Sequence, residues 1–311
     1  MLREIAPGIV LIDTMLGGME GVMAAFLVTG PQPALIETGA RTSAPVVRGA
    51  LAELGLGARD LAWIVPTHVH LDHAGGTGIL ARHFPSATVV THRRGARHLV
   101  DPARLVASSA AVYGHRRAIY GGLDPTPAER VMGVEDGHRV AVGPGRDLVL
   151  VETLGHARHH MSVLDELTGT VFAGDALGVR FPGAGLYQAL PPPDIDLAMG
   201  DRSLRRLQRL DPPMLCPSHY GPVPDPAGDL ALAREQLARL DEIVAAAGAD
   251  EEALARAVDR LLPMERAVAE AGALRDWRRL GWAEANIAGL AGWAERRAAA
   301  GGAGVDPLLS E

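Results

Sequence analysis

Three histidines and an aspartate fall within six consecutive positions of the segment PTHVHLDHAGG, residues 66–76. The segment directly follows the apolar run LAWIV, which is typical of a buried strand. Side chains alternate between the faces of a strand, so His68 and His70 point the same way, and Asp72 joins them if the chain stays extended. The glycines that follow indicate a turn into a helix, which can bring His73 beside them. The segment therefore predicts two adjacent halves of one polar site.

Imidazole nitrogens and carboxylate oxygens suit zinc, and also iron or manganese. Closed structural zinc sites usually contain several thiolates, but this chain has one cysteine, Cys216. A single cysteine also excludes an intrachain disulfide, and we expect Cys216 to be a small buried apolar residue. The available ligands thus favour a catalytic metal site over a structural one.

Further candidate ligands stand where later strands are predicted to end: His156 in LGHARHH, Asp175 in FAGDA and His219 in PSHYG. Each half-site needs one more histidine, and Asp175 can serve both. The first ion would then be held by His68, His70 and His156, and the second by Asp72, His73 and His219, with Asp175 between them. Two such ions can share a bridging hydroxide, which Asp72 and Asp175 would hold in place as catalytic residues.

Strand and helix patterns alternate along the first two thirds of the chain. Short apolar runs separated by glycine and proline predict strands over residues 9–37, and residues 43–56 have helical spacing. Residues 74–84 read as a helix and residues 87–92 as a strand, and residues 139–175 repeat the β-rich pattern of the start. Two β-rich halves predict an α/β fold in which two sheets form a sandwich with helices outside.

From about residue 227 the chain is rich in Ala, Leu, Arg and Glu with a helical period. We therefore expect a catalytic domain over residues 1–225 and a helical C-terminal appendage over residues 226–311. Trp277, Trp282 and Trp293 fall within the appendage, which could act as a lid over the site or as a dimer contact.

The motif His-x-His-x-Asp-His, formed by His68, His70, Asp72 and His73, resembles the signature of the metallo-β-lactamase-fold superfamily. The later Gly-His, Gly-Asp and Ser-His-Tyr-Gly elements follow in that family's order, and the resemblance spans roughly residues 5–225. It implies an αββα sandwich of two mixed sheets with a dinuclear site at one edge. With its C-terminal helices, the chain is similar to the branch of glyoxalase II-like thioesterases and uncharacterised hydrolases.

Two departures from the family pattern mark residues that would orient ligands without binding an ion. The family's Asp-Thr-Gly reads IETG here, which puts Glu37 at the aspartate position. The family's Gly-His-Thr-Pro-Gly-His reads GHARHH, in which His160 matches the last histidine. We also consider Tyr187 and Tyr220 as groups that could direct a phenol towards a substrate oxygen, with packing as the alternative.

The resemblance implies hydrolysis of an ester, thioester or lactone with two divalent ions, for which zinc is the first expectation and iron or manganese the alternatives. A persulfide dioxygenase of this fold remains an alternative, with a single iron on His68, His156 and Asp175. A phosphodiesterase or nuclease of the same fold is another, and a module that binds without catalysis is the last. Metal content and activity distinguish among them.

The 311 residues carry a formal net charge of -7, and their 30 Lys and Arg residues form no basic run. We therefore expect no nucleic-acid or membrane partner, but a small-molecule substrate, with a second copy of the chain as a candidate partner. The N-terminal residues lack the pattern of a signal peptide, and no uncharged apolar stretch reaches 18 residues. These features favour a cytoplasmic location.

Overall fold

A computed structural model describes residues 2–181, 183–261 and 280–301. Its first sheet has seven strands in sequence order; the first four run antiparallel and the last four pair in parallel. The strands are β1 (Leu2–Ala6), β2 (Ile9–Asp13), β3 (Ala24–Val28), β4 (Ala34–Ile36), β5 (Trp63–Val65), β6 (Thr88–His92) and β7 (Val131–Val134). The β-rich start predicted over residues 9–37 is therefore confirmed.

The second sheet has five strands in the order β14-β11-β10-β9-β8, and only β11 and β14 pair in parallel. A separate antiparallel pair joins β12 to β13. The strands are β8 (Arg139–Gly143), β9 (Arg146–Glu152), β10 (Met161–Asp165), β11 (Thr170–Phe172), β12 (Val179–Phe181), β13 (Gly185–Tyr187) and β14 (Met214–Cys216).

The two sheets face each other across one apolar layer. Ile9, Leu11 and Phe26 of the first sheet meet Leu148, Met161 and Phe172 of the second in this layer. The rings of Phe26 and Phe172 lie 5.0 Å apart, and both are almost fully buried. Cys216 is buried in the same layer, as predicted, and burial raises the pKa of its thiol.

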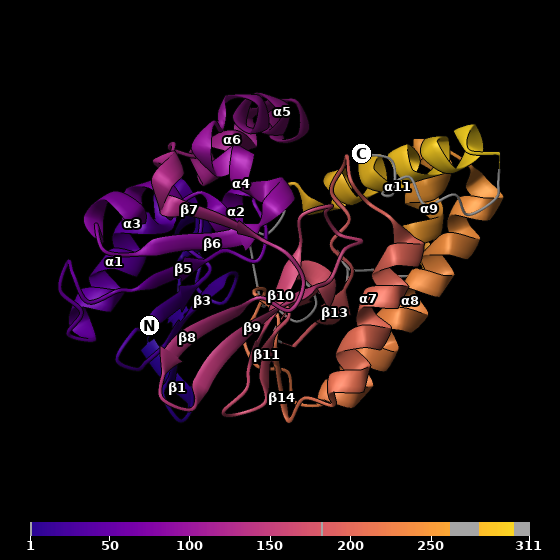
Figure 1. Cartoon of the computed structure of the whole chain (residues 1–311). Helices are drawn as coiled ribbons and strands as arrows, with labels where there is room; N and C mark the ends of the chain where they lie inside the picture. The colour runs from indigo at the N-terminus through magenta and orange to yellow at the C-terminus, as the bar shows by residue number, and fades with distance from the viewer. Residues whose placement is uncertain (1, 182, 262–279, 302–311) are drawn as a thin grey trace.

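Helices cover the outer face of each sheet, so the molecule has four layers in the order αββα (Figure 1). The apolar faces of α1 and α3 pack outside the first sheet, and those of α7 and α8 pack outside the second. This confirms the predicted fold. The helices before the second sheet are α1 (Ala44–Glu53), α2 (Leu71–Ala74), α3 (Thr77–His83), α4 (Arg93–Val100), α5 (Ala103–Tyr113) and α6 (Arg117–Tyr120).

The later helices are α7 (Leu197–Leu210), α8 (Pro226–Ala247), α9 (Glu251–Leu261) and α11 (Trp282–Ala299). This confirms that the appendage is helical where the structure describes it, while Trp277 lies outside the described residues. Side chains of α8 and α11 share an apolar cluster with β11, β14 and α7. The division at residue 225 and the dimer contact stay predictions.

The start of α11 is tied to the helical segment between β6 and β7. The Tyr120 hydroxyl donates to the carbonyl oxygen of Leu280 at 3.1 Å, and Arg116 forms an ion pair with Glu284 at 2.8 Å. These contacts bring the C-terminal helices to the sheet edge where the candidate site lies.

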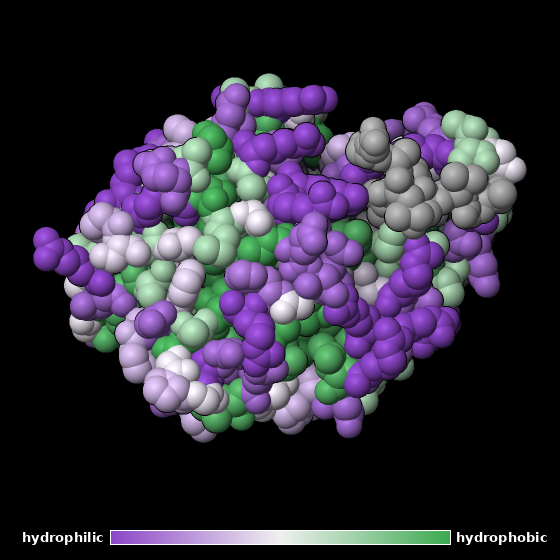
Figure 2. Space-filling view, viewed as in Figure 1, coloured by the Kyte–Doolittle hydropathy of each residue, from purple (hydrophilic) through white to green (hydrophobic). Residues whose placement is uncertain are grey.

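In the view of Figure 2, the surface over the helices is largely hydrophilic, and hydrophobic areas lie between hydrophilic ones. The large apolar side chains with notable exposure belong to separate elements: Val46, Val112, Met132, Leu167, Leu210 and Leu232. Among the described helices, none combines the length and apolar character that a membrane span requires.

Candidate metal centre

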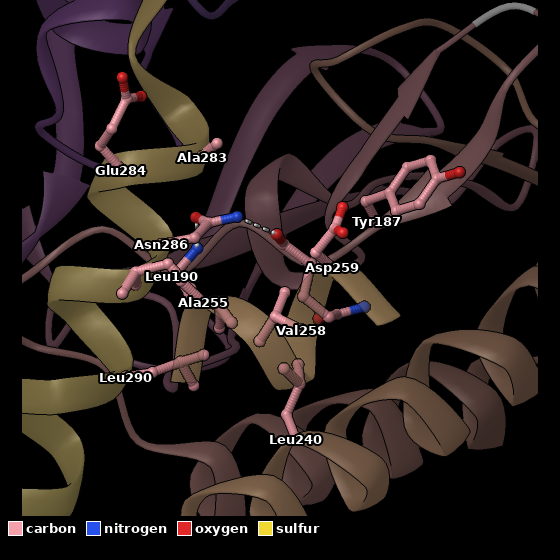
Figure 3. Close-up of a pocket in the computed structure, with 12 residues that line it drawn as sticks. Tyr187, Leu190, Leu240, Ala255, Val258, Asp259, Ala283, Glu284, Asn286 and Leu290 are labelled. Atoms are coloured by element: carbon pink, nitrogen blue, oxygen red, sulfur yellow. Dashed lines mark hydrogen bonds between the residues drawn. The ribbon is translucent and has the colours of Figure 1, made fainter. Parts of the chain in front are cut away.

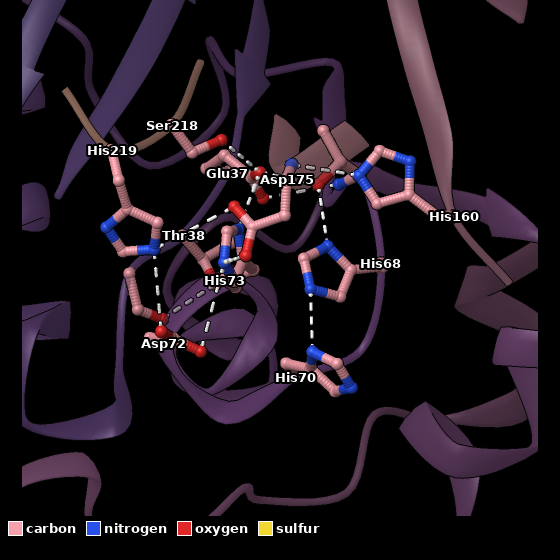
Figure 4. A network of polar contacts seen from close by, with 12 residues as sticks. Glu37, Thr38, His68, His70, Asp72, His73, His160, Asp175, Ser218 and His219 are labelled. Carbon is pink, nitrogen blue, oxygen red and sulfur yellow. Dashed lines mark hydrogen bonds and ion pairs between the residues drawn. The ribbon is translucent and has the colours of Figure 1, made fainter. Parts of the chain in front are cut away.

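The residues predicted to form the site gather at one edge of the sandwich, where strands of both sheets end (Figures 1 and 4). The first sheet contributes residues that follow β4 and β5, and the second contributes residues from the β9–β10 loop and from the ends of β11 and β14. These residues are Glu37, His68, His70, Asp72, His73, His156, His160, Asp175 and His219, and all are buried except the half-buried His70.

The histidine-rich segment reaches the site by a different local path from the one expected. Strand β5 already ends at Val65, and the chain turns into α2 with His70 as the residue before its first turn. Asp72 therefore does not continue an alternating strand; it lies beside His73 in that first helical turn. In this helical turn Asp72 and His73 can both reach the site, whereas consecutive side chains of an extended strand would point to opposite faces.

Three ring nitrogens converge in the first half of the site. His70 Nδ1 lies 2.9 Å from both His68 Nε2 and His156 Nε2, and the latter two are 3.2 Å apart. Because His156 Nδ1 donates to the carbonyl oxygen of Ala189 at 2.8 Å, its neutral ring presents a lone pair at Nε2. Ligands at zinc–nitrogen distances in a tetrahedron are separated by about 3.3 Å. The triangle has nearly the size that one ion requires.

The second half of the site combines Asp72, His73 and His219. Asp72 Oδ2 lies 3.5 Å from His219 Nε2, and Asp72 Oδ1 lies 3.9 Å from His73 Nε2. His219 Nδ1 donates to the carbonyl oxygen of Val22 at 2.7 Å, so Nε2 of the neutral ring faces the site as an acceptor. Ligand atoms of these three residues approach one another closely enough for a common ion.

Asp175 lies between the two halves. One carboxylate oxygen is 3.5 Å from His156 Nε2 and 3.4 Å from His73 Nε2, and the other is 3.9 Å from His219 Nε2. Asp175 Oδ1 and His73 Nε2 are both buried without a hydrogen-bond partner. Buried polar atoms nearly always have partners, so these two atoms fit divalent ions at this position.

The carboxylate of Glu37 orients one histidine of each half. Its Oε1 accepts from His73 Nδ1 at 2.9 Å, from Thr67 Oγ1 at 2.6 Å and from Ser218 Oγ at 2.8 Å (Figure 4). The Thr67 hydroxyl in turn accepts from His68 Nδ1 at 3.0 Å. Glu37 has a φ of 64°, a left-handed conformation that is unfavourable for most residues other than glycine. The unfavourable backbone conformation thus occurs at the residue that orients His73 and, through Thr67, His68.

His160 holds Asp175 through the backbone. Its Nε2 accepts from the Asp175 amide at 3.0 Å, so its Nδ1 carries the proton that it donates to Thr153 Oγ1 at 2.9 Å. Gly174 permits this approach, because a Cβ atom there would lie 2.5 Å from His160 Nε2, and its φ of 54° also favours glycine. This geometry suits the positioning role expected for His160.

Burial keeps the first three imidazoles neutral. Burial and then the neighbouring histidines lower the pKa of His68 well below its ordinary value. The same two causes outweigh the opposite effect of Asp72 and Asp175 at His70 and lower its pKa to about 3. The pKa of His156 is also lowered, mainly by burial. Neutral imidazole is the form that binds metal ions.

The second half has the opposite electrostatics. Burial lowers the pKa of His73, but Asp175, Glu37 and Asp72 outweigh it and raise the pKa well above the usual value. Burial raises the pKa of Asp72, yet His73 and His219 outweigh it and lower the pKa to about 2. Several ionised carboxylates around one imidazole give a negative potential that favours cations.

The cavity at the site is small, about 30 Å³. It is also lined by Tyr113 of α5, Gln188 after β13 and Asn286 of α11, none of which was predicted from the sequence, and by Trp282 of α11, which the sequence placed only in the C-terminal appendage. The Trp282 ring lies 4.9 Å from that of His219. No motif marked these residues, because they come from elements whose position depends on tertiary packing.

The two tyrosines considered for substrate contact have other partners. The Tyr187 hydroxyl donates to the carbonyl oxygen of Ala184 at 3.0 Å, and its ring lines a neighbouring, larger cavity. The Tyr220 hydroxyl donates to Asp13 at 3.0 Å, outside the residues that line the cavity at the site. Their predicted contact with substrate stays a prediction, and Tyr113 is the tyrosine that lines the site.

A family model described as the metallo-beta-lactamase superfamily matches residues 10–219. Among curated proteins, a metallo-beta-lactamase fold-containing protein from Sulfurisphaera tokodaii is 40% identical over 77 residues, which is 25% of this chain. That match spans 28% of the length of the curated relative.

Solved structures resemble this chain over a larger share of its length. An archaeal metallo-beta-lactamase superfamily protein from Sulfolobus tokodaii has a TM-score of 0.65 and 28% identity, with coverage of 74% of this chain and 85% of that one. A metallo-beta-lactamase family protein from Thermus thermophilus has a TM-score of 0.60 and 26% identity, with coverage of 87% and 92% respectively.

Proposed function

Because this chain belongs to the metallo-beta-lactamase superfamily, we propose that it is a dinuclear metal-dependent hydrolase of a small-molecule ester, thioester or lactone. The observation that carries the proposal is the pair of adjacent ligand groups with Asp175 between them. Two groups provide ligands for two ions, whereas a structural site or a mononuclear oxygenase needs only one.

Each group would hold one ion. His68, His70 and His156 offer three nitrogens to the first, and Asp72, His73 and His219 offer one oxygen and two nitrogens to the second. Asp175 can contribute to both, because its carboxylate oxygens face histidines from each group. Nitrogen and oxygen ligands without thiolate support zinc first and leave iron or manganese as alternatives.

Bound divalent ions supply a hydroxide nucleophile near neutral pH and polarise a carbonyl oxygen. The protein's own groups would position the reactants. Asp72 and Asp175, both with lowered pKa values, are ionised at neutral pH and can accept a hydrogen bond from the attacking water. Burial, followed by Asp72 and Asp175, raises the pKa of Tyr113, so its phenol stays protonated and can donate to a developing oxyanion.

Metal analysis and a substrate panel together test the proposal. We expect two equivalents of zinc per chain after purification in zinc-containing medium, and metal-dependent hydrolysis of at least one ester, thioester or lactone. One iron per chain with oxygen uptake on a persulfide would contradict it in favour of an oxidoreductase. Two bound metals without turnover of these substrates or of phosphodiesters would instead indicate a binding module.

Single substitutions test the ligand assignment. His68→Ala and Asp175→Ala should each remove at least about half of the bound metal and lower kcat/KM more than 100-fold, because loss of one ligand disrupts the shared site. The circular dichroism spectrum of each variant should match that of the unaltered protein, since neither residue belongs to the apolar layer between the sheets. His138→Ala, on a half-buried residue of the β7–β8 loop, is the matched control. Full metal content in either ligand variant would refute its assignment.

A further inference from the structure

The cavity beside the ligand groups is too small for a whole organic substrate. Its volume of about 30 Å³ corresponds to about one water-sized group. A second cavity of about 330 Å³ is within the size range of ligand pockets (Figure 3). The two cavities are neighbours, because Gln188 and Asn286 line both. A substrate whose reactive group lies at the ions can therefore extend into the second cavity.

The second cavity is formed mainly by aliphatic side chains of α8, α9 and α11 and of the segment after β13. No Lys, Arg or His occurs among the described residues that line it, and its two acidic residues, Asp259 and Glu284, are exposed. Among these described residues, an anionic arm of a substrate would find no counter-charge. The aliphatic lining comprises Leu190, Leu240, Ala255, Val258, Ala283, Ile287 and Leu290.

The residues that line both cavities are held in place by hydrogen bonds. Asn286 accepts from the Leu190 amide at 2.7 Å and donates to the Gln188 carbonyl oxygen at 3.0 Å. The Gln188 side chain donates to the carbonyl oxygen of Leu177 and to Gln236 Oε1, both at 3.3 Å. These polar groups already have partners within the protein, so they do not call for a polar ligand. What the second cavity offers to a ligand is apolar surface.

We propose that this second cavity binds a neutral aliphatic chain attached to the group that is hydrolysed. The inference rests on the proposed hydrolase function and names its substrate class: esters or thioesters with a medium-length chain. At roughly 30 Å³ per methylene-sized group, the cavity has room for about ten such groups. Each buried methylene can raise kcat/KM by up to about fourfold.

Kinetics with two ester series test the proposal in the metal-loaded protein. In one series, p-nitrophenyl esters carry acetyl, butyryl, octanoyl and decanoyl groups; in the other, acetate esters carry alcohols of the same lengths. We expect kcat/KM to rise at least tenfold from the shortest to the eight-carbon member of one series, which also shows whether the acyl or the alcohol side enters. A flat profile in both series would overturn the proposal while leaving hydrolysis established.

Val258→Trp, which fills the cavity from α9, should abolish the preference for long chains. Arg260→Trp adds the same side chain at an exposed position of α9 that does not line the cavity, and should keep the preference. A long-chain preference that persists in Val258→Trp would place the chain elsewhere and refute the proposal.

Binding without turnover separates this inference from the proposed function. Isothermal titration calorimetry with octanamide should detect binding that Val258→Trp weakens at least fivefold and Arg260→Trp leaves unchanged, while acetamide should give no signal. Such binding in a protein that hydrolyses nothing would support the aliphatic site and refute the hydrolase. No difference between octanamide and acetamide would refute the aliphatic site.

Discussion

At the scale of single residues, Glu37 connects the two halves of the site. Its carboxylate contacts His73 directly and His68 through Thr67. We predict that Glu37→Gln lowers zinc affinity about 10- to 100-fold, because an amide accepts more weakly and leaves both rings less well oriented. A competition titration against a chromogenic chelator measures this.

The control for Glu37 is Glu152→Gln. The carboxylate of Glu152 also accepts from a histidine, His92, at 2.9 Å, but neither residue belongs to the ligand groups. The zinc affinity of Glu152→Gln should match that of the unaltered protein. If the zinc affinity of Glu37→Gln is within twofold of that of the unaltered protein, the orientation of the histidines by Glu37 does not contribute to metal binding.

A substitution of Tyr113 tests whether this residue is the tyrosine that contacts the substrate. We predict that Tyr113→Phe lowers kcat about tenfold or more with unchanged metal content, because one donor to the developing oxyanion is lost. Tyr220→Phe should leave kcat unchanged, since its hydroxyl donates to Asp13. Steady-state kinetics decide, and a lower kcat in Tyr220→Phe with no change in Tyr113→Phe would support the substrate contact predicted for Tyr220.

At the scale of elements, the close approach of α11 to the segment after β13 shapes both cavities. A Cβ atom on Gly289 would lie 1.7 Å from the carbonyl oxygen of Leu190, so a larger residue must push the helix away. We predict that Gly289→Ala destabilises the protein by about 1–3 kcal/mol, measured by urea denaturation, and lowers activity through the displaced Asn286.

Gly292 of the same helix provides the comparison. A Cβ atom there would meet only the end of the flexible Arg296 side chain, at 3.3 Å. Gly292→Ala should therefore be neutral or stabilise by up to about 1 kcal/mol, because alanine favours the helix. Equal effects of the two substitutions would show that α11 is not held tightly against this segment.

At the scale of the whole molecule, buried histidines make stability depend on pH. Burial is the largest cause that lowers the pKa of six histidines: His68, His70, His98, His156, His159 and His160. The unfolded chain takes up protons below about pH 6.5 that these folded residues do not, so stability falls as pH falls. His73, with its raised pKa, acts in the opposite direction and offsets one of the six.

The chelator-treated protein should therefore lose at least about 2 kcal/mol of unfolding free energy between pH 7.5 and pH 5.5. Asp72 and Asp175 do not alter the pH dependence of the unfolding free energy between pH 7.5 and pH 5.5, since their lowered pKa values have an effect only at lower pH. Urea denaturation at three pH values, with the chelator present throughout, gives the slope. Constant or rising stability on acidification would contradict the expected balance of protonation.

The sequence patterns were sufficient for the alternation of strands and helices, for a generic α/β fold and for the selection of ligand candidates, while the αββα layers were implied by the family resemblance of the motifs. Apolar periodicity reports which face of an element is buried, and His-x-His-x-Asp-His is a local motif whose residue types limit the chemistry. The path of that segment was misjudged at Asp72, because residues 66–73 leave the strand earlier than alternation predicts.

The tertiary structure alone decided what surrounds the ligands. Tyr113 of α5 lies far in the sequence from Trp282 and Asn286 of α11, and these residues line one cavity only because the tertiary fold brings the two helices to the site. The apolar cavity beside them likewise depends on how closely α11 approaches the segment after β13. Local patterns carry no information on such distances, since packing between remote elements sets them.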